Sequence, residues 1–132
     1  MELSSLVAEI DGHQRKVVNA GIRPLRASHG ETGLPVRGGR SLPFRVDRAW
    51  NAPAGYYTES WYIVDPSSRE VLYEGPERRI RIWGLQSYSA FTDDVSESFA
   101  LTPGDYLLVL ALDRVKGGEV EIQAVEAPSE AA

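Results

Sequence analysis

The sequence predicts an all-β domain built as a β-sandwich or a small barrel. From residue 42 onward, short segments rich in β-branched and aromatic residues recur at close and regular spacing. Clusters of Gly, Pro, Asp and Ser separate these segments, as expected for turns. No segment of ten or more residues repeats its apolar positions with the 3.6-residue period of a helix. A chain of 132 residues is long enough for one domain with a core of its own.

The first of these segments runs from Leu42 to Trp50, and its apolar residues alternate with residues of the other face. This alternation predicts a strand with one buried face. A second strand is expected over 56–64, followed by a turn at Asp65–Ser68, in which proline and the Asp and Ser side chains favour a tight bend. Residues 71–73 close that hairpin.

The later segments complete the set of expected strands. Shorter strands are expected around residues 80–83, 86–92 and 99–101. The run from Tyr106 to Leu112 is apolar without alternation, which indicates a central strand covered on both faces. Gly117 and Gly118 are expected to turn the chain into a last strand over 119–125.

The N-terminal third predicts a different organisation. Apolar alternation over 6–10 and 15–20, on either side of Asp11-Gly12, is typical of a β-hairpin. Residues 21–41 are rich in glycine and lack aromatic residues, which indicates an extended segment that does not pack on itself. We therefore expect a hairpin and basic arm over 1–41, a sandwich domain over 42–126 and a flexible tail over 127–132.

Charge is distributed unevenly along the chain. Between residues 13 and 48 there are eight Lys or Arg residues against two acidic residues, a net of +6. Between residues 91 and 132 there are nine acidic residues against two basic residues, a net of −7. Such polarity favours contact between copies of the chain, or docking on a charged neighbour. Ordinary segregation of solvated surface charge explains it equally well.

No pattern in the sequence predicts catalysis, a cofactor or a metal. The chain has no cysteine, so thiolate chemistry and disulfides are excluded. His13 and His29 lack the partners of a nucleophilic triad, and the glycines of residues 30–39 do not form a phosphate-binding loop. The carboxylates of Asp93, Asp94 and Glu97 lack the spacing of a calcium loop, so we expect a solvated loop there.

Nucleic acid and membrane are also disfavoured as partners. The arm has no aromatic residues among its arginines, although single-strand binders combine the two. Trp50, Trp61 and Trp83 are expected in the core or in an interface, where their area stabilises most. No apolar run is long enough to span a membrane, and the N-terminus has no secretion signal. We expect the protein in the cytoplasm, or in a virion if it is a phage protein.

One stretch resembles a known family. Residues 101–106, Leu-Thr-Pro-Gly-Asp-Tyr, are similar to the loop that enters the penultimate strand of fibronectin type III and other immunoglobulin-like domains. The resemblance implies an immunoglobulin-like sandwich, with Tyr106 as the corner tyrosine whose hydroxyl bonds to upstream backbone.

The layout of hairpin, arm and sandwich resembles phage capsid-decoration proteins, which carry an immunoglobulin-like or tulip-shaped β domain. That resemblance implies a non-catalytic structural protein that forms homo-oligomers, exchanges its arm between neighbouring copies, and stabilises a larger protein shell. The arm residues expected at the interface are Arg23, Arg26, Arg37 and Arg40. The alternative is a small cysteine-free proteinase inhibitor of β-sandwich type, presenting a loop within 64–69 or 87–98.

The expected corner can be tested with Tyr106→Phe. Loss of one buried hydroxyl bond should lower the free energy of unfolding by on the order of 1 kcal/mol, with no effect on binding. Thermal unfolding measures the change, and an unaltered melting temperature would show that no corner bond exists.

Overall fold

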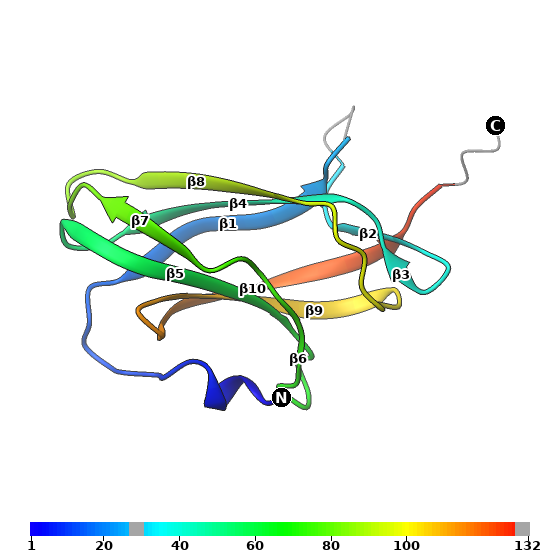
Figure 1. Cartoon of the computed structure of the whole chain (residues 1–132), viewed down its shortest axis with the longest axis horizontal. Helices are drawn as coiled ribbons and strands as arrows, with labels where there is room; N and C mark the ends of the chain where they lie inside the picture. The colour runs from blue at the N-terminus through cyan, green and yellow to red at the C-terminus, as the bar shows by residue number, and fades with distance from the viewer. Residues whose placement is uncertain (27–30, 129–132) are drawn as a thin grey trace.

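The computed structural model describes residues 1–26 and 31–128 and shows two β-sheets packed face to face (Figure 1). The smaller sheet has the antiparallel order β1-β4-β8. Its strands are β1 (Lys16–Pro24), β4 (Phe44–Asn51) and β8 (Ser89–Val95). The predicted all-β sandwich is confirmed.

The larger sheet has the order β3-β2-β10-β9-β5-β6, and β7 also pairs with β5. Its strands are β2 (Leu34–Arg37), β3 (Arg40–Ser41), β5 (Gly55–Val64), β6 (Val71–Glu74), β7 (Arg78–Ile82), β9 (Gly104–Leu112) and β10 (Val115–Glu126). β6 pairs with the end of β5 and β7 with its beginning, so the two form one interrupted edge strand. β2 joins β10 in parallel, whereas the other pairs of this sheet are antiparallel.

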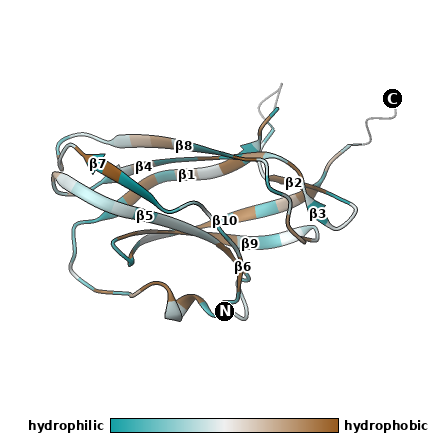
Figure 2. Ribbon diagram, in the orientation of Figure 1, coloured by the Kyte–Doolittle hydropathy of each residue, from teal (hydrophilic) through white to brown (hydrophobic). Residues whose placement is uncertain are grey.

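The main core fills the space between the sheets and follows from the alternation of the strands. In β4 the buried side chains include Phe44, Val46 and Trp50, as the sequence predicts. β9 is covered on both faces, as its continuous apolar run predicts. Figure 2 shows hydrophobic residues, in brown, interspersed with hydrophilic ones along the strands. Leu108 and Leu110 face the small sheet, while Val109 belongs to a second apolar cluster on the outer face.

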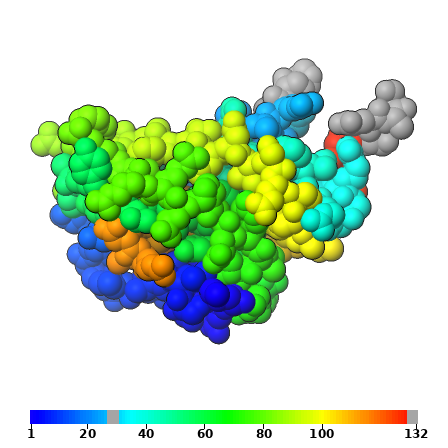
Figure 3. Space-filling model, in the orientation of Figure 1, coloured from blue at the N-terminus to red at the C-terminus, as the bar shows by residue number. Residues whose placement is uncertain are grey.

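The N-terminal residues form that second cluster, and the hairpin expected around Asp11-Gly12 is wrong. Leu3–Ser5 form a short 3-10 helix, η1, and Leu3 and Val7 are buried against the outer face of the large sheet. Ala8 bridges Val115, and Figure 3 shows this segment packed beside the turn between β9 and β10. The apolar residues of this segment cover the outer face of the large sheet and do not pair with one another in a hairpin. Within the described residues, no helix is long and apolar enough to cross a membrane.

The arm expected over 21–41 is also wrong for the residues that the structure describes. β1 continues to Pro24 along β4, and β2 places Leu34 and Val36 in the core. The boundary expected at residue 42 therefore does not separate two units. The sequence shows isolated apolar residues among glycines there, and their partners come from strands far along the chain. Residues 27–30 and 129–132, the end of the expected tail, lie outside the described residues.

The turn expected at Gly117-Gly118 lies earlier, at Asp113 and Arg114, whose φ angles are 50° and 63°. The glycines lie inside β10, where the register with β9 shifts. A Cβ on Gly117 would lie 2.1 Å from Cζ3 of Trp50. The glycine therefore makes room for a buried tryptophan. Gly75 makes room for Trp61 in the same way, since its Cβ would lie 2.2 Å from the Trp61 ring.

This packing predicts that Gly117→Ala destabilises the fold. The added methyl group must displace a fully buried ring, which costs about 1–3 kcal/mol. Gly21→Ala in β1 is the matched control, because a Cβ there meets no atom within 4 Å. Its effect should be within about 0.5 kcal/mol. Urea unfolding of both variants decides the point, and equal stabilities would contradict the tight fit of Trp50.

Candidate functional site

The arginines expected at an arm interface lie on strands or turns of the sandwich. Nε of Arg23 donates to Asp47 Oδ2 at 2.8 Å, and Nη2 of Arg37 donates to the carbonyl of Pro128 at 2.7 Å. Arg40 bonds the hydroxyl and carbonyl of Ser98, and Arg26 lies exposed in the turn after β1. Three of the four are therefore already bonded within the chain, and their interface role stays a prediction.

The corner residue makes a backbone contact of the expected kind. The Tyr106 hydroxyl donates to the carbonyl of Thr102, four residues upstream, at 2.7 Å. It also lies 3.3 Å from the Thr102 hydroxyl. This bond fixes the loop that enters β9.

The candidate catalytic and metal residues do not converge. Nδ1 of His13 accepts a bond from the backbone N–H of Arg15, and His29 lies outside the described residues. Asp93 is buried on the inner face of β8, whereas the adjacent Asp94 is on the outer face with Arg45. Neighbouring strand residues point to opposite faces, so these carboxylates cannot share an ion. Among the described residues, no group of acidic or histidine side chains could hold a metal.

A charged cluster lies instead in the core, between the two sheets. Arg48 of β4 contacts Glu59 of β5 through two nitrogens, with Nε to Oε2 at 2.9 Å. Its Nη2 is also 3.1 Å from Asp93 Oδ2, and Arg78 Nη2 is 2.7 Å from Asp93 Oδ1. The Arg48 and Glu59 side chains are fully buried, and only Arg78 reaches solvent. Two guanidinium groups thus balance two carboxylates.

Two tryptophans complete this cluster. Nε1 of Trp50 donates to Glu59 at 2.6 Å, and Nε1 of Trp61 donates to Asp93 at 2.8 Å. Burial lowers the pKa of Arg48, but its bonds to Glu59 and its attraction to both carboxylates outweigh burial and raise that pKa. Buried charges are tolerated only when they are paired and hydrogen-bonded in this way.

The importance of Arg48 and Glu59 was missed from the sequence, although a signal was present. Arg48 falls on the apolar face of the alternation from Phe44 to Trp50, where a charge must have a buried partner. The sequence does not show which carboxylate supplies that partner, because β4 and β5 face each other only in the folded chain.

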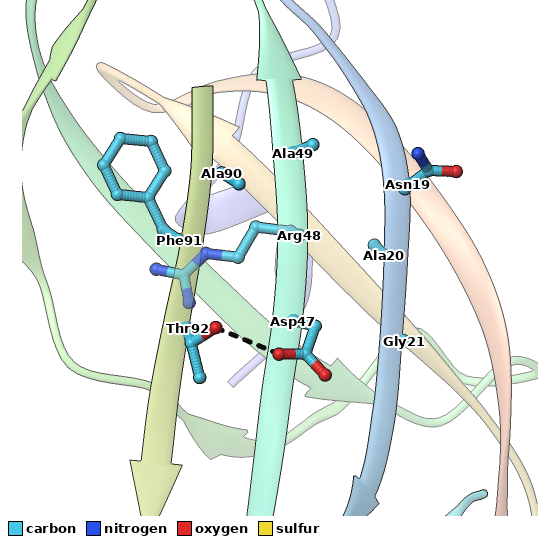
Figure 4. Close-up of a pocket in the computed structure, with 9 residues that line it drawn as sticks. All are labelled: Asn19, Ala20, Gly21, Asp47, Arg48, Ala49, Ala90, Phe91 and Thr92. Atoms are coloured by element: carbon cyan, nitrogen blue, oxygen red, sulfur yellow. Dashed lines mark hydrogen bonds between the residues drawn. The ribbon is translucent and has the colours of Figure 1, made fainter. Parts of the chain in front are cut away.

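A shallow hollow of about 380 Å³ lies along the outer face of the small sheet (Figure 4). Its surface is formed by small residues such as Gly21, Ala49 and Ala90. Asp47 lies in it, bonded to Thr92 and paired with Arg23. Partial burial raises the pKa of Asp47, but the bonds from Arg23 and Thr92 outweigh it and lower that pKa. The negative charge of Asp47 is therefore compensated by Arg23, and a lowered pKa does not suit this carboxylate to act as a general acid or base.

The loops expected for an inhibitor are short or paired. The turn after Val64 is closed by Asp65, whose Oδ1 accepts the N–H groups of Ser67 and Ser68. Most of the segment 87–98 is β8, paired with β4. Neither segment presents a long projecting loop.

One end of the large sheet exposes aromatic rings beside arginines. Tyr56 on β5 lies opposite Arg81 on β7, and both point away from the core because their neighbours Tyr57 and Ile80 point inward. We call Tyr56, Arg79, Arg81 and Trp83 the Arg–aromatic surface. The exposed fractions of Tyr56 and Trp83 are 58% and 65%.

Cation–π contacts organise the Arg–aromatic surface. Cζ of Arg81 is 4.0 Å from the centroid of the Trp83 ring and 5.7 Å from that of Tyr56. Cζ of Arg79 is 6.0 Å from the Tyr56 ring. Within the described chain, neither arginine forms an ion pair. Two unmatched charges and two exposed rings therefore lie together on the paired strands and at the start of the loop that follows.

That loop, between β7 and β8, is tied to the sandwich. The N–H of Trp83 donates to the Ser89 hydroxyl at 3.4 Å, and Nδ2 of Asn51 donates to the Leu85 carbonyl at 2.8 Å. Of the three tryptophans expected in core or interface, Trp50 and Trp61 are in the core and Trp83 is exposed.

No family model matches the chain, and no curated protein matches it significantly. Among solved structures, it is similar to the alkylpurine DNA glycosylase AlkC of Pseudomonas fluorescens bound to DNA containing an abasic site analog, with TM-score 0.57 and 9% identity. It is also similar to a mutant beta-glucosidase of Listeria innocua in complex with laminaribiose, with TM-score 0.50 and 11% identity. The matches cover 88% and 86% of this chain but 31% and 16% of those chains. Similarity at such identities shows the fold alone.

The buried cluster predicts a strong effect of Glu59→Gln. The substitution keeps the shape of the side chain but leaves positive charge uncompensated in the core, which costs about 3–5 kcal/mol. Glu74→Gln, an exposed carboxylate of β6, is the control and should change stability by less than about 0.5 kcal/mol. Guanidinium unfolding measures both. A loss below about 1 kcal/mol for Glu59→Gln would mean that the ion pairs contribute little.

Proposed function

We propose that this protein is a non-catalytic assembly module that binds another protein through the Arg–aromatic surface. The observation that carries the proposal is the exposure of Tyr56 and Trp83 beside the unpaired Arg79 and Arg81. Exposed charge on a sandwich is ordinary, but a group of exposed large rings is not.

The composition of the surface supports a protein partner. Trp, Tyr and Arg are the residues most enriched at the energetic centres of protein interfaces. Tyr56, Arg79 and Arg81 lie on the paired strands β5 and β7, so little conformational entropy is lost on binding. A sequence pI of about 5.0 makes nucleic acid the weaker partner for so few arginines.

A capsid-decoration module is one form of this proposal, in which the partner is a subunit of a larger shell. The proteinase-inhibitor alternative has less support, because the segments expected to inhibit are a tight turn and a paired strand. Both structural neighbours carry the matched fold as a minor part of a longer chain, which agrees with a modular use of the fold.

Site-specific photo-crosslinking in the native cell tests the proposal. A benzophenone amino acid in place of Tyr56 should give covalent protein adducts of defined mass, because that side chain projects from the proposed contact. The control position is Leu72 on β6, which is exposed at the other end of β5. The same adducts from both positions, or none from Tyr56, would contradict the proposal.

A further inference from the structure

The positive charge of the Arg–aromatic surface is not matched within its own chain. Arg78 is paired with the buried Asp93, but the outward-facing Arg79 and Arg81 contact rings rather than carboxylates in the part of the chain that the structure describes. A charged group against an aromatic face keeps most of its capacity for ion pairing, so these two arginines are available to a partner.

The opposite end of the same sheet carries unmatched negative charge. Asp105 at the start of β9 pairs in register with Gln123, and Glu121 lies two residues along β10 from Gln123 on the same face. Both carboxylates are exposed, and no described residue forms an ion pair with either. Glu119, the next outward residue of β10, is already paired with two cations. We call Asp105 and Glu121 the acidic end.

The two ends cannot neutralise each other within one molecule. Val64 pairs with Leu107 near the acidic end, whereas Tyr56 lies eight residues earlier on β5. At roughly 3.3 Å per residue this separation is about 26 Å, well beyond the screening length of about 8 Å at physiological salt. Figure 1 shows β5 beginning at one end of the sandwich and β9 beginning at the other.

We propose that the partner of the Arg–aromatic surface is the acidic end of a second copy of this chain. This inference rests on the proposed function and names its partner. Two arginines would meet two carboxylates, and the half-exposed Val125 beside Gln123 would give the rings an apolar contact. Because the two ends are different surfaces, the contact is head-to-tail and leaves one free end on each outer copy. Repetition builds a row or a ring of copies.

Charge reversal at each end tests the inference in the intact chain. One variant carries Arg79→Glu and Arg81→Glu, and the other carries Asp105→Lys and Glu121→Lys. The wild-type mass should rise with concentration in sedimentation velocity, and each variant alone should lose association roughly tenfold or more because like charges meet. An equimolar mixture should recover association, since the intact Arg–aromatic surface of one variant meets the intact acidic end of the other and their two reversed ends also carry opposite charges.

The combined variant with all four reversals should regain association, because the charges are again complementary. The control for charge change is Glu2→Lys with Asp11→Lys, two exposed carboxylates in the N-terminal segment, and it should associate like wild type. Thermal melting confirms that each variant is folded.

Three results would overturn the inference. These are a wild-type monomer at the highest soluble concentration, reversal variants that associate like wild type, and variants that do not bind each other when mixed. If the wild type is monomeric while position 56 cross-links to a different protein, the second copy is the wrong partner and the proposed function stands. If position 56 gives no adduct either, both fail.

Discussion

The fold depends on the pairing of one buried guanidinium. Arg48 extends from β4 into the space between the sheets and finds Glu59 on the facing sheet and Asp93 on its own. An unpaired charge at that position would be costly, so the cluster favours the arrangement of the two sheets that brings these groups together. Apolar packing alone tolerates several arrangements of the two sheets. The charged groups of this cluster, by contrast, form their hydrogen bonds and ion pairs only in an arrangement that brings them together.

The same cluster reaches the surface through Arg78. Its guanidinium pairs with Asp93 while much of its side chain lies in solvent, and it is followed directly by Arg79. β7 is thereby held against β8 from the opposite sheet, at the edge of the sandwich. The exposed rings of Tyr56 and Trp83 are presented on this fixed edge, so the interior charge network supplies the rigidity that a binding surface needs.

The fold changes which charged residues lie next to each other. Part of the basic first third is neutralised by later residues, because β4 pairs with β8 and brings Arg45 to Asp94. Arg23 is matched by Asp47 across β1 and β4. Arg79, Arg81, Asp105 and Glu121 are among the charges left without an ion pair, and the fold places them at two different ends of the large sheet.

The sequence by itself determined the fold class, because strand period, turn residues and the absence of helical period are local properties of the chain. The strands at 44–51, 55–64 and 104–112 and the upstream bond of Tyr106 follow from such local patterns. Only the tertiary structure decided where the N-terminal segment and residues 21–41 pack, since their few apolar residues take partners that are remote in sequence. It also decided that Trp83 is exposed while Trp50 and Trp61 are buried, because burial depends on which face of a sheet packs against another part of the chain. Which carboxylates pair with Arg48 was likewise decided by the packing of one sheet on the other. These residues are distant in sequence, so no local pattern identifies them.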